Sequence, residues 1–191
     1  MPLNKKHLLD LLADGPVIAS VKDEEGLTAA LESNASVLFL LYGDLLDVGD
    51  LTRRAKAAGK AVFLHLDLVE GLAAREVTVD FIARSTAADG ILSTKPQLIR
   101  RARELGLVTV QRFFLLDSMA LRNIEKHLTQ DDPDLIEVLP GLMPRVIRQL
   151  SDATGKPIIA GGLIDRKEDV VAALAAGAVA VSATRPDIWA M

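Results

Sequence analysis

Short, continuous apolar runs recur along the chain and alternate with stretches of helical periodicity. The runs begin near residues 17, 37, 61, 90, 108, 135, 157 and 179. The run at 37–41 is apolar throughout, without alternation, which is typical of a parallel strand buried on both faces. The segments between the runs carry apolar residues three and four positions apart, the period of an amphipathic helix. This alternation predicts βαβ units and a parallel sheet.

The helical segments have recognisable starts and stops. An N-terminal helix is predicted over residues 4–13, with Asn4 as its N-cap and with Gly15 and Pro16 ending it. Later helices are predicted at 23–33, 50–58, 75–87, 96–105, 118–128, 144–153 and 170–177. Several of them stop at a glycine, the residue that most readily adopts the left-handed conformation at a helix end.

Together these elements predict an α/β fold: a compact TIM-like (β/α) barrel of parallel strands in one domain over residues 1–191. At this length its helices and loops must be short. An open doubly wound sheet is the structural alternative. The first strand is not followed by G-x-G-x-x-G, which disfavours a dinucleotide-binding sheet.

Composition narrows the classes of function. The chain has no cysteine, which excludes disulfides and thiolate metal sites, and its three histidines are too few and scattered to indicate a metal. We therefore expect no metal and no cofactor. No apolar run is long enough to span a bilayer and no signal peptide stands out, so we expect a cytoplasmic protein with no membrane contact. The net charge of −4 disfavours a generally basic nucleic-acid binder but permits a local basic face.

The last two strands end in residues suited to a phosphate. Gly161 and Gly162 follow the seventh run, and Ser182, Ala183 and Thr184 close the eighth. In (β/α) barrels the loops after the last two strands commonly bind phosphate, helped by the N-terminus of a short extra helix. These five residues are therefore the predicted phosphate site. The alternatives are a tight turn at the two glycines and a helix-capping role for the two hydroxyls.

Other polar residues fall at the ends of the middle strands. They are His65, Asp67, Lys95, Arg112 and Glu137. The charge of Lys95 or Arg112 matches a phosphate, whereas Asp67 and Glu137 would accept hydrogen bonds from ligand hydroxyls. A small polyol phosphate such as glycerol phosphate has this mixture of groups. His65 is either a ligand contact or a satisfied barrel histidine. Glu137 lies in an apolar strand and needs a partner such as Arg112 or Lys95, which makes a purely structural pair the alternative.

Basic residues form two local groups on predicted helices or directly after them. One comprises Arg100, Arg101 and Arg103, and the other comprises Arg53, Arg54, Lys56 and Lys60. Charge pattern favours solvated helix faces balanced by nearby acids. The two helices are not neighbours in a barrel, so no continuous basic stripe is implied.

Several strings resemble those of the glycerol uptake operon antiterminator family, the glycerol-3-phosphate-responsive regulators. The strings are FLHLDLVEG at 63–71, GILSTK at 90–95, QRFFLLD at 111–117, DLIEVLPG at 134–141 and AGGLI at 160–164, followed by Trp189. The resemblance runs from about Pro16 to the end of the chain. The N-terminal helix departs from it, because members of the family start closer to the first strand.

The resemblance implies a TIM-barrel-like fold that binds glycerol 3-phosphate. It further implies a transcription antiterminator that binds the leader mRNA of glycerol catabolism genes, carries transcription past a terminator and stabilises that mRNA. RNA contact requires phosphate neutralisation and commonly exposed bases stacked on aromatic or arginine side chains. With few aromatics present, the face of Arg100, Arg101 and Arg103 is the candidate RNA contact.

An enzyme acting on a triose or glycerol phosphate, of the isomerase, lyase or glycerol-phosphate prenyltransferase type, is the competing hypothesis. Asp67, Glu70, Lys95 and Glu137 are enough for acid/base chemistry at a barrel mouth, but no residue is assigned a catalytic role. A purely structural barrel is the third hypothesis, and the polar rim disfavours it. A homo-oligomer is left open, with leucines of the N-terminal helix as a candidate contact.

Overall fold

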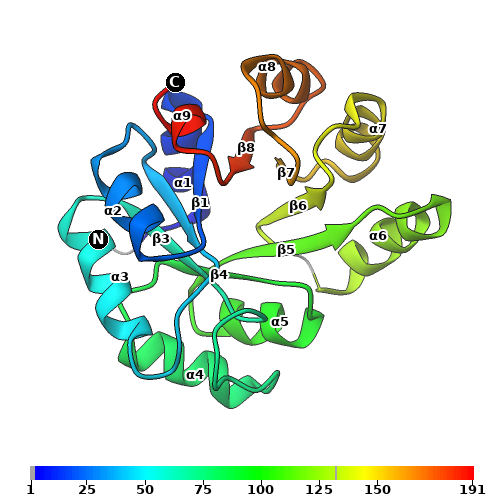
Figure 1. The fold of residues 1–191 in the computed structure, drawn as a ribbon. Helices are drawn as coiled ribbons and strands as arrows, with labels where there is room; N and C mark the ends of the chain where they lie inside the picture. The colour runs from blue at the N-terminus through cyan, green and yellow to red at the C-terminus, as the bar shows by residue number, and fades with distance from the viewer. Residues whose placement is uncertain (1–2, 132) are drawn as a thin grey trace.

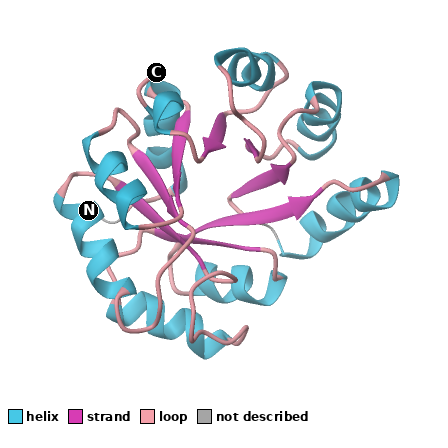
Figure 2. Cartoon of the chain, in the orientation of Figure 1, coloured by secondary structure: helices cyan, strands magenta, loops and turns pink. Residues whose placement is uncertain are grey.

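A computed structural model describes residues 3–131 and 133–191, which form a barrel of parallel strands surrounded by helices (Figure 1, Figure 2). The strands are β1 (Val17–Val21), β2 (Val37–Leu40), β3 (Ala61–His65), β4 (Gly90–Ser93), β5 (Val108–Phe114), β6 (Leu135–Leu139), β7 (Ile158–Gly161) and β8 (Ala180–Ala183). The helices are α1 (Lys5–Asp14), α2 (Glu24–Glu32), α3 (Val48–Ala57), α4 (Glu76–Ser85), α5 (Pro96–Glu104), α6 (Ser118–Asp131), α7 (Pro144–Thr154), α8 (Lys167–Ala175) and α9 (Pro186–Trp189).

The sheet closes on itself. Each strand pairs in parallel with the next, and β1 pairs with β8 through Ile18 opposite Ser182 and Ala19 opposite Ala183. Closure confirms the predicted (β/α) barrel and excludes the open doubly wound sheet. It also places the carboxyl ends of β1 and β8 side by side, although they are far apart in the sequence. Polar residues at those ends therefore share one rim of the barrel.

The barrel interior is filled by apolar side chains and is plugged at its amino-terminal end by α1. Leu8 and Leu12 of α1 are 1% exposed and pack in one cluster with inward-facing residues such as Phe39 and Phe63. The two phenylalanine rings meet edge to face, with centroids 5.6 Å apart. The cap of α1 is the predicted one, because Asn4 accepts a hydrogen bond from the His7 N–H. Since α1 buries two of its leucines under the barrel, those side chains are not an oligomer contact.

Gly90 is needed at the start of β4 for a steric reason. A Cβ at this position would lie 2.4 Å from Cε1 of Phe63 and 2.3 Å from the carbonyl oxygen of Val108. Any larger residue would displace either the ring that fills the barrel or the neighbouring strand. A second, larger apolar layer, including Leu27, Ile82 and Ile147, lies between the strands and the outer helices.

The predicted element boundaries are accurate to a few residues, with two notable differences. The fifth strand continues through Phe113 and Phe114, and the short helix α9 after β8 was not assigned a range from the sequence. Over residues 3–131 and 133–191, no helix has both the length and the apolar character needed to cross a membrane.

Candidate functional site

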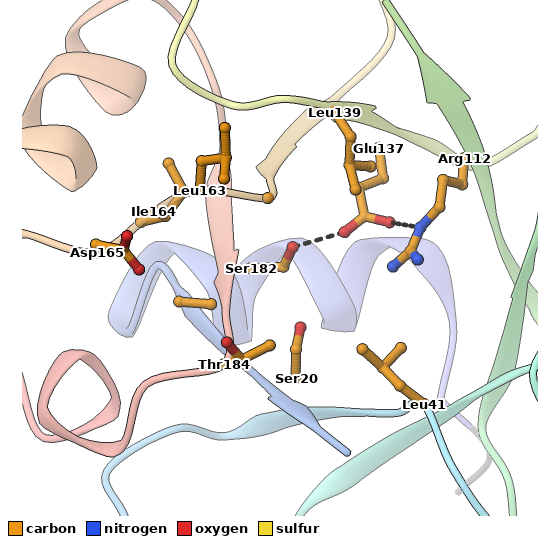
Figure 3. Close-up of a pocket in the computed structure, with 12 residues that line it drawn as sticks. Ser20, Leu41, Arg112, Glu137, Leu139, Leu163, Ile164, Asp165, Ser182 and Thr184 are labelled. Atoms are coloured by element: carbon orange, nitrogen blue, oxygen red, sulfur yellow. Dashed lines mark hydrogen bonds and ion pairs between the residues drawn. The ribbon is translucent and has the colours of Figure 1, made fainter.

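A cavity of about 150 Å³ opens among the carboxyl ends of β1, β5, β6, β7 and β8 (Figure 3). This volume is below the ~300–1,000 Å³ of pockets for drug-sized ligands, so the cavity suits a small molecule. It is lined by Ser20, Leu41, Arg112, Glu137, Leu139, Gly162, Leu163, Ile164, Asp165, Ser182, Ala183 and Thr184.

A chain of hydrogen bonds across three strands forms the polar floor of this cavity. Arg112 Nε donates to Glu137 Oε2 at 2.6 Å, and Ser182 Oγ donates to Glu137 Oε1 at 2.6 Å (Figure 3). Glu137 is fully buried and the Arg112 side chain is 9% exposed. Both oxygens of the buried carboxylate therefore have a partner, as burial of a charge requires. Of the two expected partners for Glu137, the structure selects Arg112.

The guanidinium of Arg112 keeps donor capacity for a ligand. Its Nε serves Glu137, whereas its two terminal nitrogens have no hydrogen-bond partner among the residues that the structure describes. Figure 3 shows these nitrogens on the side of the cavity where Leu41 and Ser20 lie. A guanidinium edge of this kind is suited to bidentate binding of a phosphate oxygen pair.

The two glycines at the end of β7 have different roles. A Cβ on Gly161 would lie 2.5 Å from Ser182 Oγ and 2.6 Å from Glu137 Oε1, so this glycine makes room for the buried hydrogen-bonded pair. Gly162 lines the cavity and has a φ of +74°, a left-handed conformation that favours glycine. Its carbonyl also accepts a hydrogen bond from the Gly141 N–H, which ties together the loops after β6 and β7. Gly162, not Gly161, is thus the glycine that lines the cavity.

The end of β8 lines the cavity with Ser182, Ala183 and the following Thr184. The hydroxyl proton of Ser182 is committed to Glu137, and Thr184 is exposed at the cavity edge. Neither hydroxyl caps α9, whose N-cap is Arg185 without a side-chain hydrogen bond, so the capping alternative is wrong. Trp189 holds the segment in place, because its indole N–H donates to the Ala183 carbonyl at 2.7 Å.

His65 and Asp67 lie outside the cavity lining. Burial, aided by the positive charge of Arg112, lowers the pKa of His65 to about 4, so the imidazole is neutral at pH 7. Its Nδ1 is buried without a hydrogen-bond partner among the described residues. Asp67 accepts hydrogen bonds from Ser93 Oγ at 2.6 Å, Thr94 Oγ1 at 2.7 Å and Thr94 N at 2.8 Å. Burial opposes ionisation of Asp67, but these bonds outweigh it and hold its pKa below the ordinary value.

The four residues of the enzyme hypothesis are not gathered in one place. Of Asp67, Glu70, Lys95 and Glu137, only Glu137 lines the cavity. Asp67 fastens the end of β4, Lys95 is the N-cap residue of α5, and the backbone of Glu70 bridges to Asp44. This arrangement gives the cavity one carboxylate already engaged by Arg112 and no second acid or base from the set.

Some cavity residues were not identified from the sequence. Ser20 at the end of β1 and Asp165 in the loop after β7 both line it, as do the apolar side chains of Leu41, Leu139 and Leu163. Figure 3 places Asp165 across the cavity from Arg112. A polar residue inside the apolar first strand was the only signal for Ser20, since closure of β1 onto β8 is what brings it to the site.

The basic groups are largely engaged with neighbours. Arg101 bonds to Asp80 of α4 at 2.6 Å and to Glu104 at 2.7 Å, so it joins α4 to α5. Arg100 and Arg103 are exposed on α5 and also have interaction partners. In the second group each residue has a partner as well: Arg53 with Asp50, Arg54 with Glu24, Lys56 with Asp89, and Lys60 with the Ser33 carbonyl. Balanced helix faces were the favoured interpretation of the charge pattern, and these partners agree with it.

Comparison with known proteins identifies relatives over most of the chain. The family model described as glycerol-3-phosphate responsive antiterminator matches residues 17–189. An uncharacterised protein of Escherichia coli (strain K12), YgcP, is 41% identical over 184 residues, which is 96% of each chain.

Two solved structures are similar in both sequence and fold. One is a glycerol uptake operon antiterminator regulatory protein from Listeria monocytogenes str. 4b F2365, with a TM-score of 0.89 and 31% identity over 92% of this chain and 95% of that one. The other is a glycerol uptake operon antiterminator-related protein from Thermotoga maritima MSB8, with a TM-score of 0.82 and 32% identity over 92% of this chain and 98% of that one.

Proposed function

The chain belongs to the glycerol-3-phosphate responsive antiterminator family. On this premise we propose that it is a cytoplasmic regulator that binds glycerol 3-phosphate and acts on leader mRNA of glycerol catabolism genes. The observation that carries the ligand proposal is the guanidinium of Arg112. Its terminal nitrogens have no partner within the described chain and border the small cavity at the carboxyl ends of the strands (Figure 3). No cofactor or metal takes part in this proposal.

The cavity offers complementary groups for the two parts of the ligand. The phosphate dianion would be held by Arg112 and by peptide N–H groups of Gly162 and of the Ala183–Thr184 segment. The glycerol hydroxyls would donate to the Asp165 carboxylate and exchange hydrogen bonds with Ser20. Asp67 takes no part, because its carboxylate already accepts three hydrogen bonds from Ser93 and Thr94.

The cavity is better suited to binding a ligand than to catalysing its conversion. Glu137 is the one cavity residue of the four named in the enzyme hypothesis, and Arg112 and Ser182 occupy both of its oxygens. A general base must be able to accept a proton from the substrate, and a carboxylate engaged in this way is poorly placed to do so. An enzyme acting on a triose or glycerol phosphate remains the second candidate because the barrel mouth and its phosphate-compatible loops would serve it equally well.

Titration calorimetry with glycerol 3-phosphate tests the ligand site, with inorganic phosphate and glycerol as controls. We expect micromolar binding of the whole ligand and its loss in Gly162→Asp, which puts a carboxylate into the cradle. Gly155→Asp is the matched control, because Gly155 also has a left-handed φ, +60°, but lies in open space at the end of α7. Loss of binding in both variants would mean that strain, not the site, is responsible.

Leader RNA binding is measured separately, by fluorescence anisotropy with and without saturating ligand. We expect glycerol 3-phosphate to raise the affinity for RNA. A ligand that binds one state of the loops at the carboxyl end of the barrel more tightly shifts the population toward that state, which would be the state that binds RNA. RNA affinity that is unchanged by ligand would contradict the regulatory role. Mass spectrometry of glycerol 3-phosphate after long incubation with Mg²⁺ and candidate co-substrates tests the second candidate, and conversion of the ligand would establish an enzyme.

A further inference from the structure

Exposed large apolar side chains gather at the carboxyl end of the barrel. Of the eleven that are found among the described residues, eight lie in or beside the loops that follow β2, β3, β5, β6 and β7. These eight, which we name the apolar rim, are Leu45, Leu46, Leu68, Phe114, Leu116, Met119, Leu142 and Leu163. Apolar residues exposed at random would be spread over the whole surface, whereas these lie around one end of the molecule.

The apolar rim is large enough to form an interface. From the exposed fractions of its members, which are spread over five loops, the rim exposes on the order of 800 Å² of apolar side chain in total. One partner of a standard-size protein interface contributes ≈ 800 Å². The area of the rim therefore matches what one protomer brings to a stable pair.

The most exposed member of the rim, Leu46, is held rigidly in solvent. Asp44 Oδ1 accepts from the Leu46 N–H at 2.6 Å and from the Asp47 N–H at 3.1 Å, and Asp47 Oδ1 accepts from the Asp44 N–H at 2.7 Å. The next loop supports this turn, since the Leu45 N–H donates to the Glu70 carbonyl and the Glu70 N–H to the Gly43 carbonyl. Leu46 is 92% exposed in this fixed turn, so its backbone loses little freedom when a partner covers it.

A depression of complementary character lies on another part of the same end, beyond β5 and β6. It has a volume of about 240 Å³ between α6 and α7. Its lining is Leu115, Leu116, Asp117, Ser118, Leu121, Met143, Arg145, Val146 and Gln149. The lining is thus mostly apolar and has room for a leucine side chain.

The charges around Leu46 and around the depression favour one way of pairing two barrel ends. Leu46 is bordered by the acidic Asp47 and Glu70, both exposed, so two Leu46 turns placed face to face would repel each other. The lining of the depression carries one exposed cation, Arg145, and one exposed carboxylate, Asp117, whose Oδ1 accepts hydrogen bonds from the N–H groups of Met119 and Ala120. It is therefore not net acidic, unlike the surroundings of Leu46.

We propose that two copies of this chain associate end to end through the apolar rim, with Leu46 of each inserted into the depression between α6 and α7 of the other. This pairing is isologous, because the same two features of each copy are used twice across a two-fold axis. It buries the apolar rim of both copies and brings Glu70 toward Arg145 of the other copy. It depends neither on the ligand nor on RNA, so its failure would leave the proposed function intact.

Sedimentation equilibrium of the full chain without ligand tests the association. We expect a dimer at tens of micromolar, and a dissociation constant raised at least tenfold in Leu46→Asp, since a buried leucine would be replaced by a charge. Val171→Asp is the matched control, because Val171 is 56% exposed on α8 and lies outside the rim, and it should leave the dimer intact. Circular dichroism confirms that each variant is folded. A wild-type chain that stays monomeric at several hundred micromolar would overturn the proposal.

Disulfide trapping tests the pairing itself, and the absence of cysteine from the sequence makes it clean. Leu46→Cys combined with Leu116→Cys should give a cross-linked dimer on mild oxidation, because each new thiol faces the other type across the interface. Leu46→Cys combined with Val171→Cys should not. Efficient cross-linking of Leu46→Cys alone would show that the two Leu46 turns meet each other, and the proposed pairing would be wrong.

Discussion

Removal of Arg112 should destabilise the barrel strongly, and removal of its partner as well should restore most of the loss. In Arg112→Met the fully buried carboxylate of Glu137 keeps only the hydrogen bond from Ser182. Breaking a buried pair in this way costs about 3–5 kcal/mol of unfolding free energy, because an uncompensated charge remains. For a chain of this size that corresponds to a fall in Tm of roughly 10 °C.

The double variant Arg112→Met, Glu137→Leu contains no buried charge at this position. Its unfolding free energy should lie within about 1–2 kcal/mol of the wild-type value, since buried ion pairs replaced by apolar residues of similar volume are often neutral. Urea unfolding followed by circular dichroism measures both variants, with m-values compared to check that the denatured state is unchanged. Arg54→Met is the control: the Arg54–Glu24 pair is 36% and 60% exposed, and its loss should cost at most about 1 kcal/mol.

The same variants separate stability from ligand binding. Both the single and the double variant lack the guanidinium, so both should lose affinity for glycerol 3-phosphate even though only the single variant is strongly destabilised. A loss below about 1 kcal/mol in Arg112→Met would refute the argument that Glu137 depends on this partner. Wild-type ligand affinity in the double variant would show that Arg112 is not the anion contact.

Three further predictions concern residues around the cavity. The pKa of His65 is lowered to about 4 in the folded protein, whereas the unfolded chain keeps the ordinary pKa of about 6.5. Between these two pH values the unfolded state binds more protons, so stability should fall as pH drops from about 6.5 toward 4. His65→Gln should reduce that slope in urea titrations. Gly161→Ala should cost about 1–3 kcal/mol in urea unfolding by crowding Glu137, whereas Gly15→Ala, with open space around it, should have little effect. Trp189→Phe loses the hydrogen bond to the Ala183 carbonyl and should weaken ligand binding in calorimetry; unchanged affinity would mean that the segment after β8 needs no such anchor.

The sequence alone determined the order and type of nearly all the elements. Runs such as 37–41 are apolar without interruption because a parallel strand in a barrel is covered on both faces, and this signal is local. The partnership of Glu137 with a cation was also predictable, because a carboxylate in an apolar strand cannot remain unpaired. The resemblance to the antiterminator family rested on equally local strings of residues, and the family comparison confirms it.

Only the tertiary structure decided which polar residues share a cavity. Successive side chains of a strand point to opposite faces of the sheet. Arg112 therefore reaches the cavity inside the barrel, whereas the adjacent Gln111 lies on the outer face with Phe113, toward α5 and α6. Asp67 and Lys95 stand at strand ends as the sequence indicated, yet neither lines the cavity, because one fastens β4 and the other begins α5. Such outcomes depend on turn geometry that residue type does not specify.

Closure of the barrel determined which distant residues came together. It brought Ser20 of β1 and Ser182 of β8, which are distant in sequence, into the lining of one cavity. It also brought the loops of five strands to one end, where their apolar side chains form the apolar rim. Each of these residues, taken by itself in the sequence, is an ordinary apolar residue in or beside a loop. Their common exposure follows from the shared direction of parallel strands, which places every carboxyl-terminal loop at the same end of the barrel.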